Sequence, residues 1–344
     1  MEEYPKISVV VPIRNEGSYI TSTLRFLLEQ DYPPDKLEVL VVDGESDDRG
    51  PAVVRELAAE DNRIRLLSNP KRLSSAGRNI GARNASGRIV IFVDGHTYID
   101  NDQLLKNTVR LMDKHHLSVL SRPQFLETPE NTFFQNAVAL ARRSIIGHGP
   151  DSTIYTNQEK AVDPTSSGAS YRREVFDRVG FFDERFDACE DVEFNYRLSR
   201  SGLQSFTSLK TAVYYYPRAS ISALFRQLKR YGIGRFRLAC KHPQTLSFST
   251  LIPFFFTAGI PILAILSLFF RPVAYLFFAV IALYLLLVFL LSAVIAVRRG
   301  LVYLTVLPAI FPVIHIGLGW GFLTELVRTA VGRGMVFEKP ENTT

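Results

Sequence analysis

Asp94 and His96 flank a glycine directly after a run of five apolar residues, and both side chain types are common metal ligands. The run, residues 89–93, predicts a strand buried on both faces, because a half-exposed strand would alternate apolar with polar residues. In an open α/β sheet, ligands bind just outside the carboxyl ends of the strands, and Asp94 and His96 fall there. We therefore expect this turn to hold a divalent metal ion that grips the phosphates of a nucleotide, although an ordinary strand-end turn could have the same sequence.

Two earlier apolar runs also end on polar residues. Residues 7–12 are followed by Arg14 and Glu16, and residues 37–42 are followed by Asp43. Segments with apolar residues at helical spacing separate the strands, and such an alternation argues for a parallel sheet with helices on both faces. The predicted fold class is therefore α/β with a Rossmann-like, mostly parallel sheet. Its strand ends would bring three loops, distant in sequence, to one site.

Several other kinds of protein are disfavoured. The first strand is not followed by Gly-x-Gly-x-x-Gly, and the chain has no Walker lysine loop, which argues against a dinucleotide site and a P-loop. Two cysteines cannot form a disulfide framework, so a reducing compartment is the simplest interpretation. With a net charge of +6 and no basic stripe on a recognisable module, we expect no nucleic-acid partner.

Glu190 and Asp191 form a second candidate site. They begin a segment in which Val192 and Tyr196 have helical spacing. Acidic residues are favoured in the first turn of a helix by its dipole, so a purely structural role would also explain them.

The C-terminal part is strongly apolar. Between residues 251 and 324 the only full charges are three arginines. Segments 251–270, 273–297 and about 301–323 each reach the roughly 20 apolar residues that cross a bilayer. The third contains prolines and glycines, so it could cross with a kink or dip and return. His315 within it is expected to form a helix–helix hydrogen bond rather than to act in catalysis.

A basic segment precedes these spans. Residues 211–250 contain no Asp or Glu but seven Lys and Arg residues. This pattern predicts an amphipathic helix in the lipid headgroup layer, or alternatively a helix packed on the protein with a solvated basic face. Either way, the basic excess indicates the cytoplasmic side. The expected parts are a cytosolic domain (1–217), the basic helix and linker (218–250), a membrane region (251–327) and a tail (328–344).

Several motifs in order along the first 240 or so residues resemble the nucleotide-sugar-dependent glycosyltransferases of family 2. The resemblance implies the GT-A fold. Within the family, the Asp-Gly-His variant and short membrane part look most like membrane glucosyltransferases of the succinoglycan type, which extend lipid-linked oligosaccharides for exopolysaccharides. The motifs are Val11-Pro12-Ile13-Arg14-Asn15-Glu16, Val42 to Asp48, Gly77-Arg78-Asn79-Ile80-Gly81 through Gly87 to Asp94, Gly168 with Tyr171-Arg172-Arg173, Glu190-Asp191, and Gln227 to Tyr231.

The resemblance implies a role for each candidate. Asp94 and His96 would hold Mn²⁺ or Mg²⁺ against the donor diphosphate. His96 replaces the family's usual second aspartate, and its imidazole favours manganese. Asp191 would be the general base, with Glu190 as the runner-up or as a residue that orients the acceptor. The residues implied in donor binding are Pro12, Arg14, Glu16, Asp43, Arg78, Arg122 and Arg230.

Within that donor set the implied contacts differ. Asp43 would accept a hydrogen bond from the nucleobase, with Arg78 nearby. Pro12 and Glu16 would help to hold the base and ribose. Arg230 would meet either the diphosphate or a group of the acceptor.

The implied activity is inverting transfer of a sugar from a nucleotide-sugar, with UDP-sugar favoured, to a lipid-linked saccharide. The acceptor would be a polyprenyl phosphate or diphosphate saccharide at the cytoplasmic face of a multi-pass membrane protein, in polysaccharide or glycan biosynthesis. A polyprenyl-phosphate sugar synthase is the nearest alternative. A nucleotidyltransferase and an inactive membrane-anchored binding protein are less favoured.

Overall fold

The computed structural model describes residues 4–148 and 154–335, and the chain divides into two compact units. The first comprises residues 1–128 and 152–216, and the second comprises 129–151 and 217–344. Residues 129–148, which fall inside the domain expected at 1–217, thus pack with the second unit. Residues 336–344 of the expected tail lie outside the described residues, as do 149–153.

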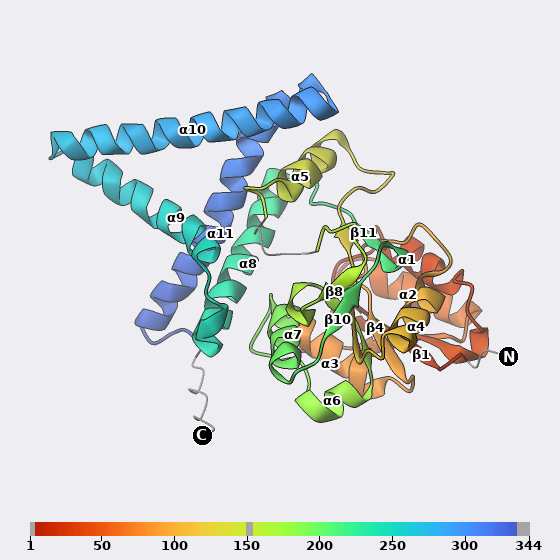
Figure 1. The fold of residues 1–344 in the computed structure, drawn as a ribbon. Coiled ribbons are helices and arrows are strands. Elements are labelled where there is room, and N and C mark those ends of the chain that lie inside the picture. The colour runs from red at the N-terminus through yellow and green to blue at the C-terminus, as the bar shows by residue number, and fades with distance from the viewer. Residues whose placement is uncertain (1–3, 149–153, 336–344) are drawn as a thin grey trace. The chain divides into compact units, whose positions relative to one another are not determined.

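A six-stranded sheet in the order β3-β2-β1-β4-β9-β6 forms the centre of the first unit (Figure 1). β9 (Gly168–Arg172) pairs antiparallel with both β4 and β6 (Val119–Ser121). The mostly parallel sheet predicted from the sequence is confirmed, with β9 as an antiparallel insertion. The four parallel strands are β1 (Ile7–Ile13), β2 (Leu37–Asp43), β3 (Ile64–Ser68) and β4 (Ile89–Phe92).

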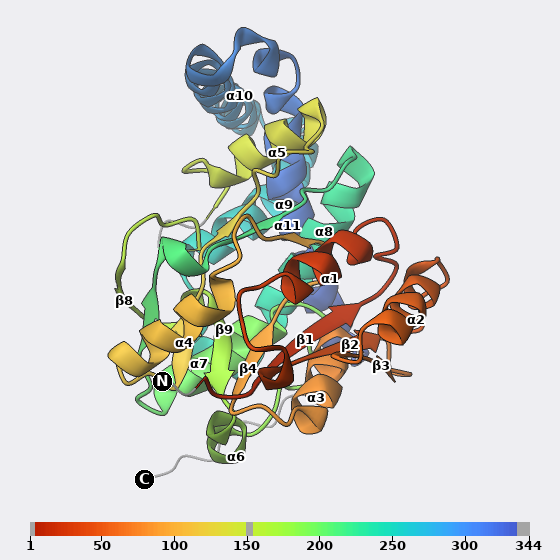
Figure 2. The same ribbon diagram turned by 90° about the vertical axis from the view of Figure 1, so that its right-hand side faces the viewer.

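Helices cover both faces of this sheet, as predicted. In β1, Val9 and Val11 belong to one buried cluster, whereas Val10 belongs to the other. The first cluster includes residues of α1, α2 and α4, and the second includes residues of α3, α6 and α7. Figure 2 shows α1 and α3 on opposite sides of the strands. The helices are α1 (Ile20–Leu28), α2 (Gly50–Glu60), α3 (Ser74–Asn84), α4 (Leu104–Lys114), α6 (Glu174–Val179) and α7 (Glu190–Arg200).

Two smaller sheets complete the first unit. One has the order β5-β11-β7 and joins β5 (Thr97–Tyr98), β11 (Val213–Tyr215) and β7 (Gln124–Phe125). The other pairs β8 (Lys160–Val162) with β10 (Ser205–Thr207). Because β5 follows the 94–97 turn directly, the three-stranded sheet brings β11 to the carboxyl end of β4.

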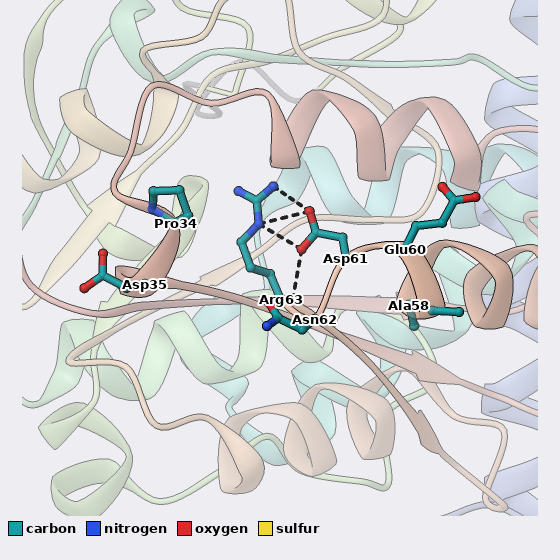
Figure 3. A pocket seen from close by; sticks show the side chains of 8 residues that line it. Pro34, Asp35, Ala58, Glu60, Asp61, Asn62 and Arg63 are labelled. Atoms are coloured by element: carbon teal, nitrogen blue, oxygen red, sulfur yellow. Dashed lines mark hydrogen bonds and ion pairs between the residues drawn. The ribbon is translucent and has the colours of Figure 1, made fainter.

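A surface hollow lies at the opposite edge of the main sheet, where β2 and β3 begin (Figure 3). Within it Arg63 and Asp61 form an ion pair of 2.6 Å. Arg63 also donates to the carbonyl oxygen of Leu28 at 3.2 Å. The hollow is lined by Pro34, Asp35, Ala58, Ala59, Glu60, Asp61, Asn62 and Arg63.

The second unit is helical, and three of its helices are long and apolar enough to cross a membrane. This confirms the three apolar segments predicted. The third helix begins at Leu307, after the short 3₁₀ helix η5 (Leu301–Thr305), and continues through Pro312. Whether this helix crosses a membrane stays a prediction. The helices are α5 (Phe133–Arg143), α8 (Ile221–Lys241) and the apolar α9 (Phe248–Ser267), α10 (Arg271–Arg299) and α11 (Leu307–Ala330).

The basic helix α8 packs against α11 through glycines. A Cβ added to Gly232 would lie 2.1 Å from the carbonyl oxygen of Leu318, and one added to Gly321 would lie 2.0 Å from that of Lys229. This close packing covers part of the apolar face of α8. The position of α8 in the headgroup layer stays a prediction.

His315 joins three segments of the second unit. Its Nδ1 lies 3.0 Å from the Tyr284 hydroxyl of α10, and its Nε2 lies 2.8 Å from the carbonyl oxygen of Ile146. The helix–helix hydrogen bond predicted for His315 is confirmed.

Candidate active site

The 94–97 turn after β4 is built against β1 and α1. The buried Thr23 hydroxyl lies 3.1 Å from the Gly95 carbonyl oxygen and 2.9 Å from that of Thr97. It also accepts a hydrogen bond from the Thr97 N–H at 3.2 Å. A Cβ on Gly95 would lie only 2.7 Å from Cγ2 of Ile13. The glycine is therefore needed for the turn to approach β1 so closely.

Asp94 presents a partly exposed carboxylate at this turn. Its Oδ1 lies 2.9 Å from Nη2 of Arg78, and 32% of the side chain is exposed. Burial alone would raise the pKa of Asp94, but the Arg78 guanidinium, with His96 and Arg122, holds it below its ordinary value. Asp94 is thus ionised at neutral pH, as a metal ligand must be.

His96 contacts a carboxylate and an aromatic ring. Its Nδ1 lies 3.0 Å from Oε1 of Glu16, and its ring centroid lies 5.6 Å from that of Tyr215 in β11. No group of three or more His, Cys, Asp and Glu residues in the described part of the chain could hold a metal by itself. One carboxylate and one imidazole fit a metal ion that takes its remaining ligands from substrate phosphates and water.

Glu190 and Asp191 lie in the first turn of α7. Oε1 of the buried Glu190 accepts hydrogen bonds from the Ser74 hydroxyl at 2.6 Å and from Nε of Arg78 at 3.2 Å. The pKa of Asp191 is raised above its ordinary value, first by burial and then by the charge of Glu190, while Arg78 opposes the shift. An aspartate in this state is a better proton acceptor than a solvated one.

Arg78 connects the two acidic groups. One guanidinium contacts both Asp94, at 2.9 Å, and Glu190, at 3.2 Å. It lies over the Phe92 ring, 5.3 Å from the centroid. The turn after β4 and the start of α7 therefore form one charged cluster, although about a hundred residues of sequence separate them.

Neighbouring elements hold α7 in place. Asn195 of α7 donates to the carbonyl oxygen of Gly168 at 3.0 Å and accepts from the Tyr171 hydroxyl at 2.9 Å. A Cβ on Gly168 would lie 2.5 Å from Oδ1 of Asn195. From α3, Asn79 pairs with both the N–H and the carbonyl of Phe182, each at 2.9 Å. These contacts fix the loop and the helix that present Glu190 and Asp191.

The loops after β1 and β2 are tied together at the same edge. Asp43 accepts a 2.6 Å hydrogen bond from the Ser46 hydroxyl, which in turn accepts from the Asn15 N–H at 2.9 Å. Pro12 is partly buried in β1, and Arg14 is exposed. The structure thus brings the strand-end loops together as expected.

Arg122 and Arg230 have different surroundings. The Arg122 side chain is buried, with 2% exposure of the residue, and donates to the carbonyl oxygen of Phe92 at 2.7 Å. Its Nε and Nη1 have no hydrogen-bond partner in the described part of the chain. A buried guanidinium with two unmatched donors fits an anionic ligand. Arg230 is exposed on α8 and belongs to the second unit.

Three site neighbours were not foreseen from the sequence: Thr23, Ser74 and Tyr215. Ser74 begins α3, just before the Gly77–Gly81 motif. Its position next to this motif was a usable signal. Tyr215 lies in a three-residue strand whose pairing with Thr97 no local pattern reveals. Burial and the charge of Asp94 raise the pKa of Tyr215, so its hydroxyl keeps its proton.

The fold and this charged edge define an α/β enzyme of the GT-A type. The model of Glycosyl transferase family 2 matches residues 8–180. The chain belongs to this family and is a glycosyltransferase of polysaccharide or glycan biosynthesis.

Two curated relatives illustrate the kinship. Succinoglycan biosynthesis protein ExoA of Rhizobium meliloti (strain 1021) is 32% identical over 250 residues, which cover 71% of this chain and 73% of the relative. The dolichyl N-acetyl-alpha-D-glucosaminyl phosphate 3-beta-D-2,3-diacetamido-2,3-dideoxy-beta-D-glucuronosyltransferase of Methanococcus voltae is 28% identical over 236 residues, covering 67% and 72%.

Solved structures show the same fold. The mannosyltransferase PcManGT of Pyrobaculum calidifontis, in complex with GDP-Man and Mn²⁺, has a TM-score of 0.60 and 21% identity, covering 93% of this chain and 88% of that one. TarS 1-349 of S. aureus, in complex with UDP-GlcNAc, has a TM-score of 0.52 and 18% identity, covering 97% and 94%.

Proposed function

We propose that the protein is an inverting transferase that moves a sugar from a nucleotide-sugar, UDP-sugar first among the candidates, to a lipid-linked saccharide at the cytoplasmic face of a membrane. The observation that carries the proposal is the Arg78 guanidinium, which contacts both Asp94 and Glu190. Asp191 follows Glu190 in the first turn of α7. A donor diphosphate at Asp94 and an acceptor hydroxyl at Asp191 would therefore lie on either side of the Arg78 guanidinium.

Donor binding is assigned to the strand-end loops. Asp43 keeps acceptor capacity beyond its bond to Ser46 and would take a hydrogen bond from the nucleobase, with Pro12 beside it. The unmatched N–H groups of Arg122 would meet the diphosphate. Arg14 would add positive charge toward the donor, and the contact of Arg230 with the donor or the acceptor stays a prediction. A divalent ion held by Asp94 and His96 would neutralise the charge that grows on the leaving diphosphate.

Asp191 would act as the general base. It takes the proton of the acceptor hydroxyl while that oxygen attacks the anomeric carbon, and the bond from this carbon to the diphosphate breaks on the opposite side. A single displacement of this kind inverts the anomeric centre. Glu190, already bonded to Ser74 and Arg78, would orient the acceptor.

A lipid-linked acceptor is supported by three features. The chain has three helices apolar enough to cross a membrane, and the basic helix α8 precedes them. The Methanococcus voltae relative is named for a dolichyl-linked sugar phosphate. The excess of positive charge before the spans favours the cytoplasmic side for the catalytic unit.

The test is a donor panel followed by product extraction. UDP-, GDP- and dTDP-sugars, each with and without Mn²⁺, are screened for a rise in the unfolding midpoint of the detergent-solubilised full chain, because a ligand that binds the folded state stabilises it. The selected donor is labelled and incubated with membrane lipids. Release of nucleoside diphosphate and a labelled lipid-linked saccharide are expected. A polyprenyl monophosphate sugar, or release of pyrophosphate, would overturn this assignment.

A further inference from the structure

The side chain of Glu16 contacts the candidate metal ligand His96. Oε1 of Glu16 lies 3.0 Å from Nδ1 of His96, and the two side chains are only 15% and 17% exposed. The family resemblance implies that Glu16 helps to hold the base and ribose of the donor. In the structure its one hydrogen-bonding or ionic side-chain contact among the described residues is with the His96 ring.

The backbone holds Glu16 in this place. Asn15, just before it, has a left-handed φ of 59°, and the Glu16 carbonyl oxygen accepts the N–H groups of Tyr19 and Ile20, both at 2.9 Å. A Cβ added to Gly95 would lie 3.2 Å from Cγ of Glu16. The missing side chain at Gly95 therefore makes room for the stem of Glu16 as well as for β1.

The contact decides which ring nitrogen can bind a metal. An ionised carboxylate only accepts hydrogen bonds, so in neutral His96 the Nδ1 carries the proton that Glu16 accepts. Nε2 then keeps its lone pair. Metal-binding histidines commonly have such a carboxylate on the other nitrogen, where it fixes the ring and increases its basicity.

We infer that Glu16 is a positioning residue for metal binding, which orients His96 and keeps its Nε2 free to bind the divalent ion. The inference rests on the proposed metal role of Asp94 and His96.

The first experiment measures Mn²⁺ binding by electron paramagnetic resonance on the full chain in detergent, with UDP present. Glu16→Ala should lower Mn²⁺ affinity by about tenfold or more, and Glu16→Gln, which keeps a hydrogen-bond acceptor, should lower it less. Electron spin echo modulation should show imidazole nitrogen at Mn²⁺ in the wild type, weaker in Glu16→Ala and absent in His96→Asp. Glu60→Gln, a glutamate at the end of α2 on the opposite edge of the sheet, is the matched control and should bind Mn²⁺ like the wild type.

The second experiment is a double-mutant cycle. In the His96→Asp background there is no imidazole ring for Glu16 to orient, so Glu16→Gln should lower Mn²⁺ affinity less there than in the wild type. Such a dependence on the residue at position 96 is not expected of a glutamate that serves only the fold or the ribose.

The outcomes separate the inference from the proposed function. A nitrogen signal that Glu16→Ala leaves unchanged, or equal effects of Glu16→Gln in both backgrounds, would overturn the role of Glu16 and leave the transferase assignment intact. Absence of the nitrogen signal in a wild type that still binds Mn²⁺ would remove His96 as a ligand, and the inference with it. Failure of the protein to bind any nucleotide-sugar would instead refute the proposed function.

Discussion

The two edges of the parallel sheet carry charge in different ways. At the amino edge, in the hollow of Figure 3, Arg63 pairs with Asp61 two residues away. At the carboxyl edge, Arg78 is shared between Asp94 and Glu190, which come from distant parts of the chain. There Arg122 is also buried with two unmatched donors.

The difference separates charges that serve the fold from charges that await a ligand. A local, partly exposed pair such as Arg63 with Asp61 satisfies its own donors and contributes little stability, on the order of 0–1 kcal/mol. The buried guanidinium of Arg122, with two unmatched donors, is costly unless a ligand pairs with it. The position of polar residues at a strand end is therefore less informative than how their charges are paired.

The largest expected effect is that of Asp191→Asn. Removing the general base should lower the transfer rate by about a thousandfold. The folded protein raises the pKa of Asp191, so ionising this group costs stability as the pH rises from its unfolded pKa through its folded one. The variant should therefore unfold at a higher temperature at neutral pH. Rate assays check the loss of transfer, and calorimetry checks the rise in unfolding temperature. Asp61→Asn, from the amino edge, is the control and should leave the transfer rate unchanged.

Gly95→Ala tests how tightly the carboxyl edge is packed. The added methyl would lie 2.7 Å from Cγ2 of Ile13, so the turn must move. Overpacking of this kind costs about 1–3 kcal/mol. A displacement of the turn should also lower kcat by up to about a hundredfold. Gly259→Ala, whose methyl would meet open space in α9, is the control and should lower neither stability nor kcat.

Much of this edge could be predicted from the sequence. The buried runs 7–12, 37–42 and 89–93 identified three parallel strands, and parallel strands necessarily align their carboxyl ends. The clustering of Asp94 with the loops after β1 and β2 followed from that rule alone.

The partners of these residues could not be predicted. The antiparallel position of β9, the placing of Tyr215 over His96 and the contact of Glu16 with His96 all depend on pairings between distant segments. No local periodicity encodes them. The resemblance implied a role for Arg122 in donor binding. Its two unmatched donors, however, are visible only in the folded structure.

Arg122→Met compares the two edges directly. Two donors of Arg122 are buried and unmatched without ligand, which is costly, so the variant should have an unfolding midpoint equal to or above that of the wild type. The donor should raise the unfolding midpoint of the variant much less than that of the wild type. The KM for the donor should increase about tenfold, because one charge-assisted hydrogen bond to the diphosphate is lost. Arg63→Met should leave the KM unchanged. Unfolding of Arg122→Met without any donor would assign Arg122 to the fold.

The smallest expected effect is a shift in the pH profile of kcat/KM. Asp191 must be deprotonated to act as a base, and its raised pKa places the acid limb of the profile above the pH at which an ordinary aspartate would titrate. After burial, the largest cause of the shift is the charge of Glu190. Glu190→Gln should therefore move the acid limb to lower pH, because the neutral amide no longer opposes ionisation of Asp191. An acid limb that stays in place would mean that another group is the base. Glu190 and Asp191 would then serve the fold, as Arg63 and Asp61 do at the amino edge.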